Sequence, residues 1–264
     1  MEVRSRSLIG VAVVALFVFA SPSYAVDKAS ILGIWLFDEQ QGDVAVDSSG
    51  NGRDGEIQGN AKRVEGEFGG ALSFPGQGDS EVIIPHDDGL NVKEFSITAW
   101  VKPAVTGQQF QVIVTKGSEA TTYGYYLILY ASPPQFNIAG FTPAPQDWKE
   151  AFGTTDVRDD QWHHLAGTYD KESVKFYRDG ELEGELAVSS DPDVVDTPLA
   201  IGAQHDGVWP IQGIIDDVGL FSVGLTEDEV KDIMSKGLAE VTGVLPVSSA
   251  GKSATAWGKI KAQY

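Results

Sequence analysis

DDQWHHLAGTYDKESVKFYRDGELEGE, residues 159–185, is the stretch of this sequence that decides the fold. It contains an extended run from Trp162 to Tyr169, a polar break at 170–173, and a second extended run from Val174 to Arg178. Asp179-Gly180 follows, the type of dipeptide that best accepts the positive φ angles of a tight type I′ turn. The stretch therefore predicts three consecutive antiparallel strands.

The rest of the chain shows the same kind of pattern. Apolar runs are short, and they are separated by turns in a sequence with 30 Gly and 12 Pro. In the run 95–103, Phe95, Ile97, Ala99 and Val101 alternate with polar or amphipathic residues and should face the core. Further strands are expected at 31–37, 69–74, 81–85, 110–116, 124–130, 135–141, 199–202 and 213–221. The prediction is an all-β sandwich.

One segment has helical character. Thr226 and Glu229 form a capping box, acidic residues fill the first turn, and Lys236-Gly237 supplies a stop signal. We therefore expect a short helix from Glu227 to about Ser235 near the end of the domain.

A series of motifs follows in order along the chain. The motifs are WLFDE at 35–39, DSSGNG at 47–52, GGALSF at 69–74, FSITAWVKP at 95–103, the hairpin at 162–180, IDDVGLFS at 215–222 and LTEDEV at 225–230. This ordered set resembles the laminin-G-like branch of the concanavalin A-like lectin/glucanase domains. The resemblance covers residues 30 to 238 and implies a two-sheet antiparallel jelly roll whose first and last strands pair.

The N-terminus has the pattern of a secretory signal. Arg4 and Arg6 precede an apolar run at 8–20, and Ser23-Tyr24-Ala25 offers small residues at the positions that a signal peptidase reads. The alternative is a membrane anchor, for which the run is short. We expect a signal peptide at 1–25, a domain at 26–240, a tail at 241–264 and a secreted protein, extracellular, periplasmic or on the cell surface, that does not insert into the membrane once the signal is removed.

The charge of the chain limits its partners. The formal net charge is −19, and removal of Arg4, Arg6 and Glu2 with the signal changes it to −20. Such a chain repels phosphate, so nucleic acid is not an expected partner, whereas divalent cations are. The alternative is that the excess charge only keeps an exported protein soluble. The absence of cysteine excludes disulfides, thiolate metal sites and a thiol nucleophile.

Oxygen-bearing side chains from two distant parts of the chain form a candidate metal site. If the first and last strands are neighbours, as the resemblance implies, these side chains come close together, and calcium takes about six to eight oxygen ligands. Calcium is therefore a candidate cofactor, with Asp38, Asp47, Asn51, Asp54 and Asp216 as ligands and Glu39 and Asp217 beside them. The alternative is that these groups cap the backbone of turns.

Aromatic residues in or beside loops are the candidates for ligand contact, because aromatic faces stack on sugar rings. We assign Tyr123, Trp148, His205 and Trp209 to this role. Core packing is the alternative for Tyr125 and Tyr126, since one of two neighbours on a strand must point inward. For Trp209 the alternatives are a ligand platform at the rim and a cover over the core.

Catalytic patterns are weak. Glu181, Glu183 and Glu185 alternate along one strand and could suggest a glycosidase, but the family's Glu-x-Asp-x-x-Glu signature is absent and a solvated strand face is the simpler explanation. His163 and His164 point to opposite faces of a strand and cannot chelate one metal ion side by side, while His86 and His205 are isolated in sequence. There is no Gly-x-Ser-x-Gly elbow.

The leading interpretation is a secreted, non-catalytic module that binds an extracellular glycan or glycoprotein. The alternatives are a structural or adhesive surface or matrix protein without glycan binding, and a glycoside hydrolase.

Overall fold

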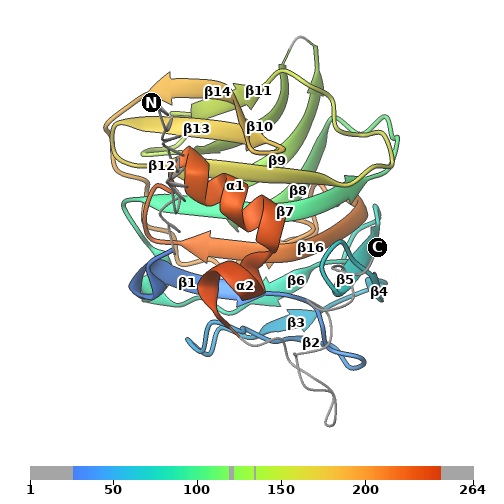
Figure 1. Cartoon of the computed structure of the whole chain (residues 1–264). Helices are drawn as coiled ribbons and strands as arrows, with labels where there is room; N and C mark the ends of the chain where they lie inside the picture. The colour runs from blue at the N-terminus through green and yellow to red at the C-terminus, as the bar shows by residue number, and fades with distance from the viewer. Residues whose placement is uncertain (1–25, 119–121, 134, 245–264) are drawn as a thin grey trace, which may run out of the picture.

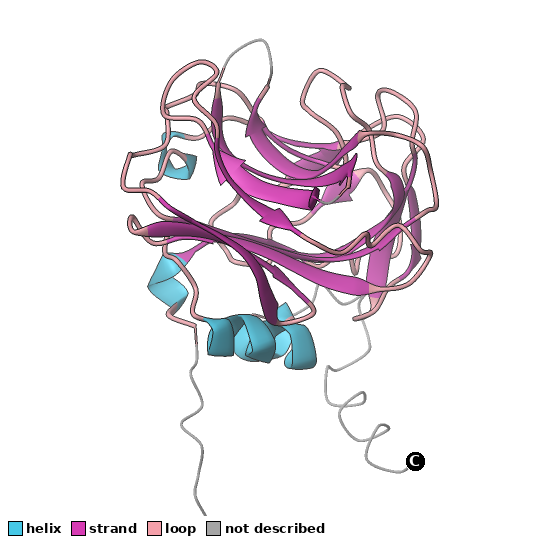
Figure 2. Cartoon of the chain, turned by 90° about the horizontal axis from the view of Figure 1, so that it is seen from above, coloured by secondary structure: helices cyan, strands magenta, loops and turns pink. Residues whose placement is uncertain are grey.

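The computed structural model describes residues 26–118, 122–133 and 135–244, and within them the chain forms two eight-stranded antiparallel sheets packed face to face (Figures 1 and 2). The all-β sandwich is therefore confirmed. The expected signal peptide and all of the expected tail beyond residue 244 lie outside the described residues.

The order of strands shows how distant segments meet. Sheet A runs β14 (Glu181–Ala187), β13 (Ser173–Arg178), β12 (His163–Tyr169), β7 (Phe95–Pro103), β16 (Gln212–Phe221), β5 (Gly70–Pro75) and β4 (Lys62–Glu65), with β1 (Ile31–Trp35) also on β16. Sheet B runs β11 (Lys149–Gly153), β10 (Gln135–Phe141), β9 (Tyr123–Ser132), β8 (Phe110–Gly117), β15 (Leu199–Ile201), β6 (Val82–Ile84), β3 (Gly55–Ile57) and β2 (Val44–Ala45). The first and last strands pair, as expected.

The hairpin of residues 159–185 forms as predicted. β12, β13 and β14 are consecutive antiparallel neighbours. Asp179 and Gly180 have φ angles of 50° and 79°, both positive, as a type I′ turn requires.

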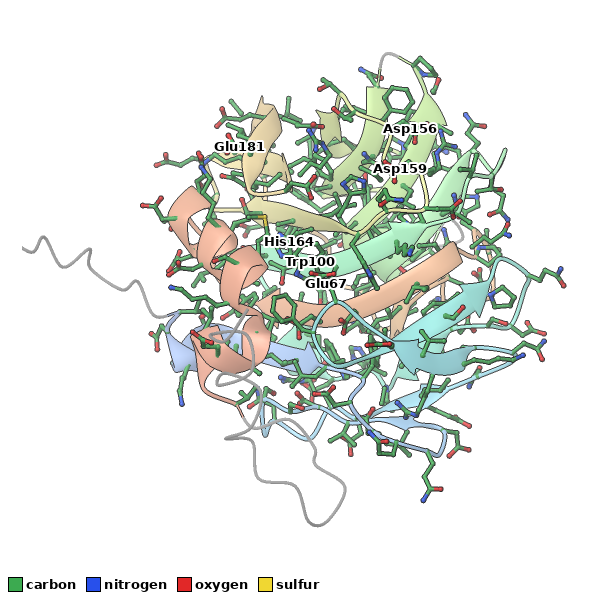
Figure 3. All side chains as sticks on the ribbon, turned by 45° about the vertical axis from the view of Figure 1, so that its right-hand side comes forward. Glu67, Trp100, Asp156, Asp159, His164 and Glu181 are labelled. Carbon is green, nitrogen blue, oxygen red and sulfur yellow. The ribbon has the colours of Figure 1, made fainter. Side chains whose placement is uncertain are left out.

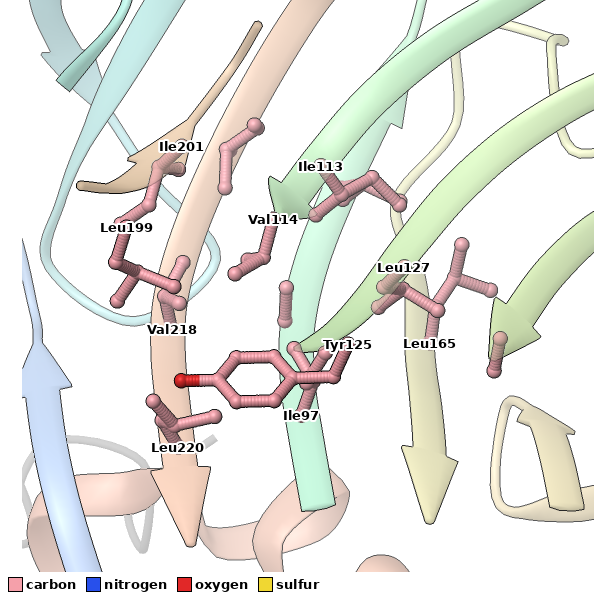
Figure 4. Close-up of a cluster of buried hydrophobic side chains, with 14 of the residues drawn as sticks. Ile97, Ile113, Val114, Tyr125, Leu127, Leu165, Leu199, Ile201, Val218 and Leu220 are labelled. Carbon is pink, nitrogen blue, oxygen red and sulfur yellow. The ribbon is translucent and has the colours of Figure 1, made fainter. Parts of the chain in front are cut away.

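The core lies between the two sheets. Phe95, Ile97, Ala99 and Val101 of β7 are fully buried in it, which confirms the predicted inward face. Figure 4 shows Ile97 among other buried side chains of this core, including Tyr125 and Leu220. Aromatic rings extend the core: Phe95 contacts Tyr125, Phe141 and Tyr169 at ring-centroid distances of 5.4, 6.2 and 5.9 Å. Stability therefore comes from apolar packing between sheets in a chain without disulfides.

Two helices cover part of the outer face of sheet A (Figure 2). α1 (Glu227–Lys236) has the predicted capping box and buries Val230 and Ile233. α2 (Leu238–Thr242) was not predicted; it follows Gly237, whose positive φ of 77° lets the chain turn before a second helix begins. α2 ends two residues beyond the expected domain boundary at 240.

Several strands escaped prediction because they are short or polar. β4 reads KRVE and lies at the edge of sheet A, while β11 reads KEAFG and lies at the edge of sheet B. Edge strands need no continuous apolar face, so their sequences carry little alternation. Two 3₁₀ turns, Lys28–Ser30 and Asp88–Leu90, complete the described elements. No helix in the described part of the chain is long and apolar enough to cross a membrane.

Candidate functional site

The outer face of sheet B carries the residues that we assigned to ligand contact. We call this surface the aromatic face. Its buried members are Val112, Tyr123, Tyr126, Ile128 and Ile138, its partly buried members are Phe110, Tyr130, Phe152 and Trp209, and Trp148 stands against it. Tyr125 points the other way, into the core, where its hydroxyl donates to the carbonyl of Leu90 at 3.1 Å. Of the Tyr125–Tyr126 pair, one ring therefore faces each side of the sheet.

Trp148 is the most exposed ring of the aromatic face. Its exposed fraction is 43%, and its ring contacts those of Tyr123 and Tyr126 at centroid distances of 5.5 and 6.2 Å. Both tyrosines are 1% exposed. The indole is thus held on a buried aromatic base while much of its surface stays open to solvent.

A row of outward-facing residues crosses the strands beside Trp148. Tyr126 on β9 lies opposite Gly140 on β10, and Gly140 lies opposite Glu150 on β11. The Tyr126 hydroxyl reaches across β10 and donates to Glu150 Oε1 at 2.7 Å. Burial raises the pKa of Glu150, and burial followed by the nearby Glu150 charge raises the pKa of Tyr126. The Glu150 carboxylate is therefore hydrogen-bonded to one of the two tyrosines that support the exposed indole.

The loop 204–210 forms the other border of the aromatic face. Gln204 Nε2 donates to the Tyr123 hydroxyl at 2.8 Å, which links this loop to the base beneath Trp148. Trp209 stacks on Phe110 at 4.5 Å with an interplanar angle of 22°, and its carbonyl accepts from Val112 N at 2.9 Å. One face of its indole is thus occupied by Phe110. His205 Nε2 is buried and has no hydrogen-bond partner among the described residues.

Trp209 also has an unusual backbone. Its φ of 55° is in the left-handed region, which is costly for a bulky residue and persists only where surrounding contacts hold it. The stack on Phe110 and the hydrogen bond to Val112 supply such contacts. These contacts support the cover interpretation of Trp209 over the platform one.

The expected calcium ligands fall into two groups. In the first group, the side chains cap turns: Asp47 accepts from the backbone N of Ile34, Ser49 and Arg53, and Asp54 accepts from Asp47 N at 2.7 Å. Asn51 Nδ2 donates to the carbonyls of Ile31 and Leu32. This is the role that the alternative interpretation gave them.

The second group gathers around the loop 66–70. Asp38 Oδ1 accepts from Gly70 N at 2.8 Å, and Asp216 Oδ2 accepts from Phe68 N at 2.9 Å. Burial, with the neighbouring Asp217 charge, raises the pKa of Asp216 to about 9; burial also raises the pKa of Asp217 to about 7 and that of Asp38. Asp216 Oδ1 is buried with no hydrogen-bond partner among the described residues. An all-oxygen donor set with one unused buried oxygen suits a hard cation.

Within residues 26–118, 122–133 and 135–244, however, no group of three or more His, Cys, Asp and Glu side chains is arranged to hold a metal ion. Asp38 and Asp216 would need backbone carbonyls or water to complete a calcium shell. The calcium site therefore stays a prediction, and its candidate side-chain ligands are reduced from five residues to Asp38 and Asp216.

His163, His164 and the alternating glutamates occupy sheet A. His164 and Asp216 lie on either side of Trp100 on the outer face, and the Trp100 and His164 rings are 5.5 Å apart (Figure 3). Burial lowers the pKa of His164 to about 4. The neighbouring His163 instead contacts Asp179 at 2.9 Å, which raises its pKa.

Glu183 is tied into the hairpin rather than free. Its carboxylate accepts from Arg178 Nε at 2.6 Å and from Thr154 N at 2.9 Å. Glu181 and Glu185 are exposed on the same strand. The contacts of Glu183 give this carboxylate a structural role.

Comparison with known proteins agrees with this architecture. The Laminin_G_3 family model, of the concanavalin A-like lectin/glucanases superfamily, matches residues 76–231, more than half of the chain. The chain belongs to this laminin G-like family. A curated relative, adhesion G-protein coupled receptor V1 of Danio rerio, is 24% identical over 148 residues, which is 53% of this chain but 2% of that protein.

Similar solved structures share the laminin G-like fold. Domain 4 of AbnA, an extracellular arabinanase of Geobacillus stearothermophilus in complex with arabinotriose, is 22% identical with a TM-score of 0.61, over 78% of this chain and 98% of that one. The binding domain of botulinum neurotoxin serotype G is 15% identical with a TM-score of 0.63, over 78% of this chain and 50% of that one. At these identities the likeness concerns the fold.

Sequence reasoning assigned Tyr123, Trp148 and Trp209 of the aromatic face to ligand contact, but it missed the contacts that connect them to the rest of this surface. Phe110, Tyr130 and Phe152 read as ordinary strand residues, and Gln204 and Glu150 gave no signal. Their role depends on strand register, which brings β11 and the loop 204–210 beside β9.

Proposed function

We propose that the protein is a secreted, non-catalytic module that binds extracellular carbohydrate through the aromatic face. The observation that carries the proposal is Trp148, an indole 43% exposed on a base of two buried tyrosines. A large exposed ring on a rigid support offers contact area at low cost in conformational entropy. The acceptor on Glu150 and the hydroxyl of Tyr126 add polar groups beside the ring.

Two further features support a binding role. The outer face of sheet A is partly covered by α1 and α2, whereas the rings of the aromatic face are in part exposed. Domain 4 of the arabinanase, which shares this fold, was solved with arabinotriose, a short neutral sugar chain. A glycan or the glycan of a glycoprotein is therefore the proposed partner.

Calcium has a supporting role in this proposal. Asp38 and Asp216 would hold the ion near the loop 66–70, where it would neutralise charge buried on sheet A. Sheet A lies opposite the aromatic face, so the ion would stabilise the sandwich without touching the glycan. Any dependence of glycan binding on calcium would then arise because the ion stabilises the folded domain.

A glycan array tests the function, run in millimolar calcium and in chelator on the chain that begins at Val26. We expect binding that Trp148→Ala abolishes. Leu182→Ala serves as the matched control, because Leu182 on β14 has the same exposed fraction, 43%. Binding that survives Trp148→Ala would place the ligand elsewhere, and no binding to any glycan would favour a structural or adhesive protein.

A further inference from the structure

The hydrogen bond between Tyr126 and Glu150 passes over a glycine on the middle strand. Gly140 separates Tyr126 and Glu150 in the cross-strand row, and a Cβ at this position would lie 2.4 Å from Lys149 O and 3.0 Å from Tyr126 Oη. Any side chain here would therefore collide with the bridge between the tyrosine and the carboxylate. Glycine therefore leaves room for the Tyr126 hydroxyl to reach Glu150 across β10.

Glu150 is held in one position. It is half-buried, and Tyr126, itself 1% exposed, donates to one of its two oxygens. A carboxylate has about four acceptor sites, so this single bond leaves most of its capacity unused. An ordered acceptor beside an aromatic ring can receive hydroxyl groups from a ligand that stacks on the ring.

The surroundings of this acceptor are negative. Lys149 follows Trp148 but contacts Asp147 in an ion pair. The chain as a whole carries a formal net charge of −19. An anionic ligand would therefore meet repulsion from Glu150 and from this net charge, and the Lys149 cation is already paired with Asp147.

We propose that Trp148 and Glu150 form one subsite that takes an uncharged sugar with adjacent hydroxyl groups and rejects uronic, sulfated and sialylated sugars. Trp148 supplies the stacking face and Glu150 accepts the hydroxyl hydrogens. Tyr126 is a positioning residue, because it acts by holding Glu150. This proposal rests on the proposed function and adds to it the class of sugar.

Isothermal titration against defined oligosaccharides tests the subsite. The neutral probes are hexasaccharides of arabinose, xylose, mannose and glucose, and the anionic probes are hexagalacturonate, a heparin hexasaccharide and sialyllactose. At low salt we expect at least one neutral probe to bind and every anionic probe to bind more weakly than the best neutral one.

The variant Glu150→Gln tests the acceptor, and it retains an amide oxygen for the Tyr126 hydroxyl. Its affinity for the neutral probe should fall about tenfold, which corresponds to about 1.4 kcal/mol for one hydrogen bond to a charged group. Glu181→Gln is the matched control: it removes the same charge from an exposed position on β14, and it should leave affinity within about twofold, as surface changes ordinarily do. Tyr126→Phe should weaken binding while Glu150 keeps its charge.

Three outcomes would overturn the proposal. Tighter binding of an anionic probe than of any neutral one would refute the sugar class while leaving the glycan-binding function intact. Equal affinity of wild type and Glu150→Gln, with equal melting temperatures, would remove Glu150 from the subsite. Binding to no probe of either class would reject the proposed function and the subsite together.

Discussion

Replacing Trp148 by alanine should weaken ligand binding more than it weakens the fold. The indole is 43% exposed, so somewhat more than half of its surface is covered. A fully buried Trp hides roughly 150–250 Å². The covered part is then about 85–140 Å², worth at most about 3.5 kcal/mol at about 25 cal/mol per Å².

The measured loss of stability should be smaller than that limit. Alanine keeps the Cβ contact, and the unfolded chain already hides part of its apolar surface. We therefore expect Trp148→Ala to lower the free energy of unfolding by about 1–2 kcal/mol, below the roughly 3–5 kcal/mol of a fully buried Trp. Urea titration gives this quantity, and an unchanged m-value shows that the comparison is between similar states.

The affinity for glycan should change by more than the folding stability does. Loss of a central aromatic anchor costs about 2 kcal/mol or more, which is more than about tenfold in affinity. Leu182→Ala, with the same exposed fraction, should leave affinity unchanged. If Trp148→Ala binds glycan as wild type does, or if it loses about 4 kcal/mol of stability, the indole belongs to the fold and the reasoning is refuted.

Four other predictions follow from named residues. Calcium at about 100 times its dissociation constant should add about 2.7 kcal/mol of stability, with a rise in melting temperature that Asp216→Asn abolishes; equal melting curves in calcium and in chelator would exclude the site. Trp209→Ala should cost about 2–3 kcal/mol in urea titration because its ring stacks on Phe110; a loss of affinity without a loss of stability would restore the platform role. Burial lowers the pKa of His164 to about 4, so between about pH 6.5 and 4 the unfolded chain binds a proton at this residue and the folded chain does not. The free energy of unfolding should therefore fall by up to about 1.4 kcal/mol per pH unit as pH drops from about 6.5 toward 4. His164→Gln should flatten this dependence, and an unchanged pH profile of stability in that variant would contradict the assignment. Mass spectrometry of exported protein should find Val26 at the N-terminus. Exported protein that still carries residues 1–25 would contradict the predicted signal peptide and secretion.

The sequence by itself determined the local structure. Alternation from Phe95 to Val101 placed four side chains in the core, and the Asp179-Gly180 dipeptide specified a turn with two positive φ angles. These features depend on residues next to one another along the chain, where sterics and period-two alternation act directly. The capping box at Thr226 belongs to the same class.

Tertiary structure decided which side chains meet. Tyr126 and Glu150 are separated by 24 positions in sequence and are joined only because β10 carries glycine between them. The expected metal ligands illustrate the same point: Asp47 accepts hydrogen bonds from the backbone around its own turn, whereas Asp38 and Asp216 both accept hydrogen bonds from the loop 66–70. Strand register and loop packing set these contacts, and both are settled by the free energy of the whole core, which no local pattern contains.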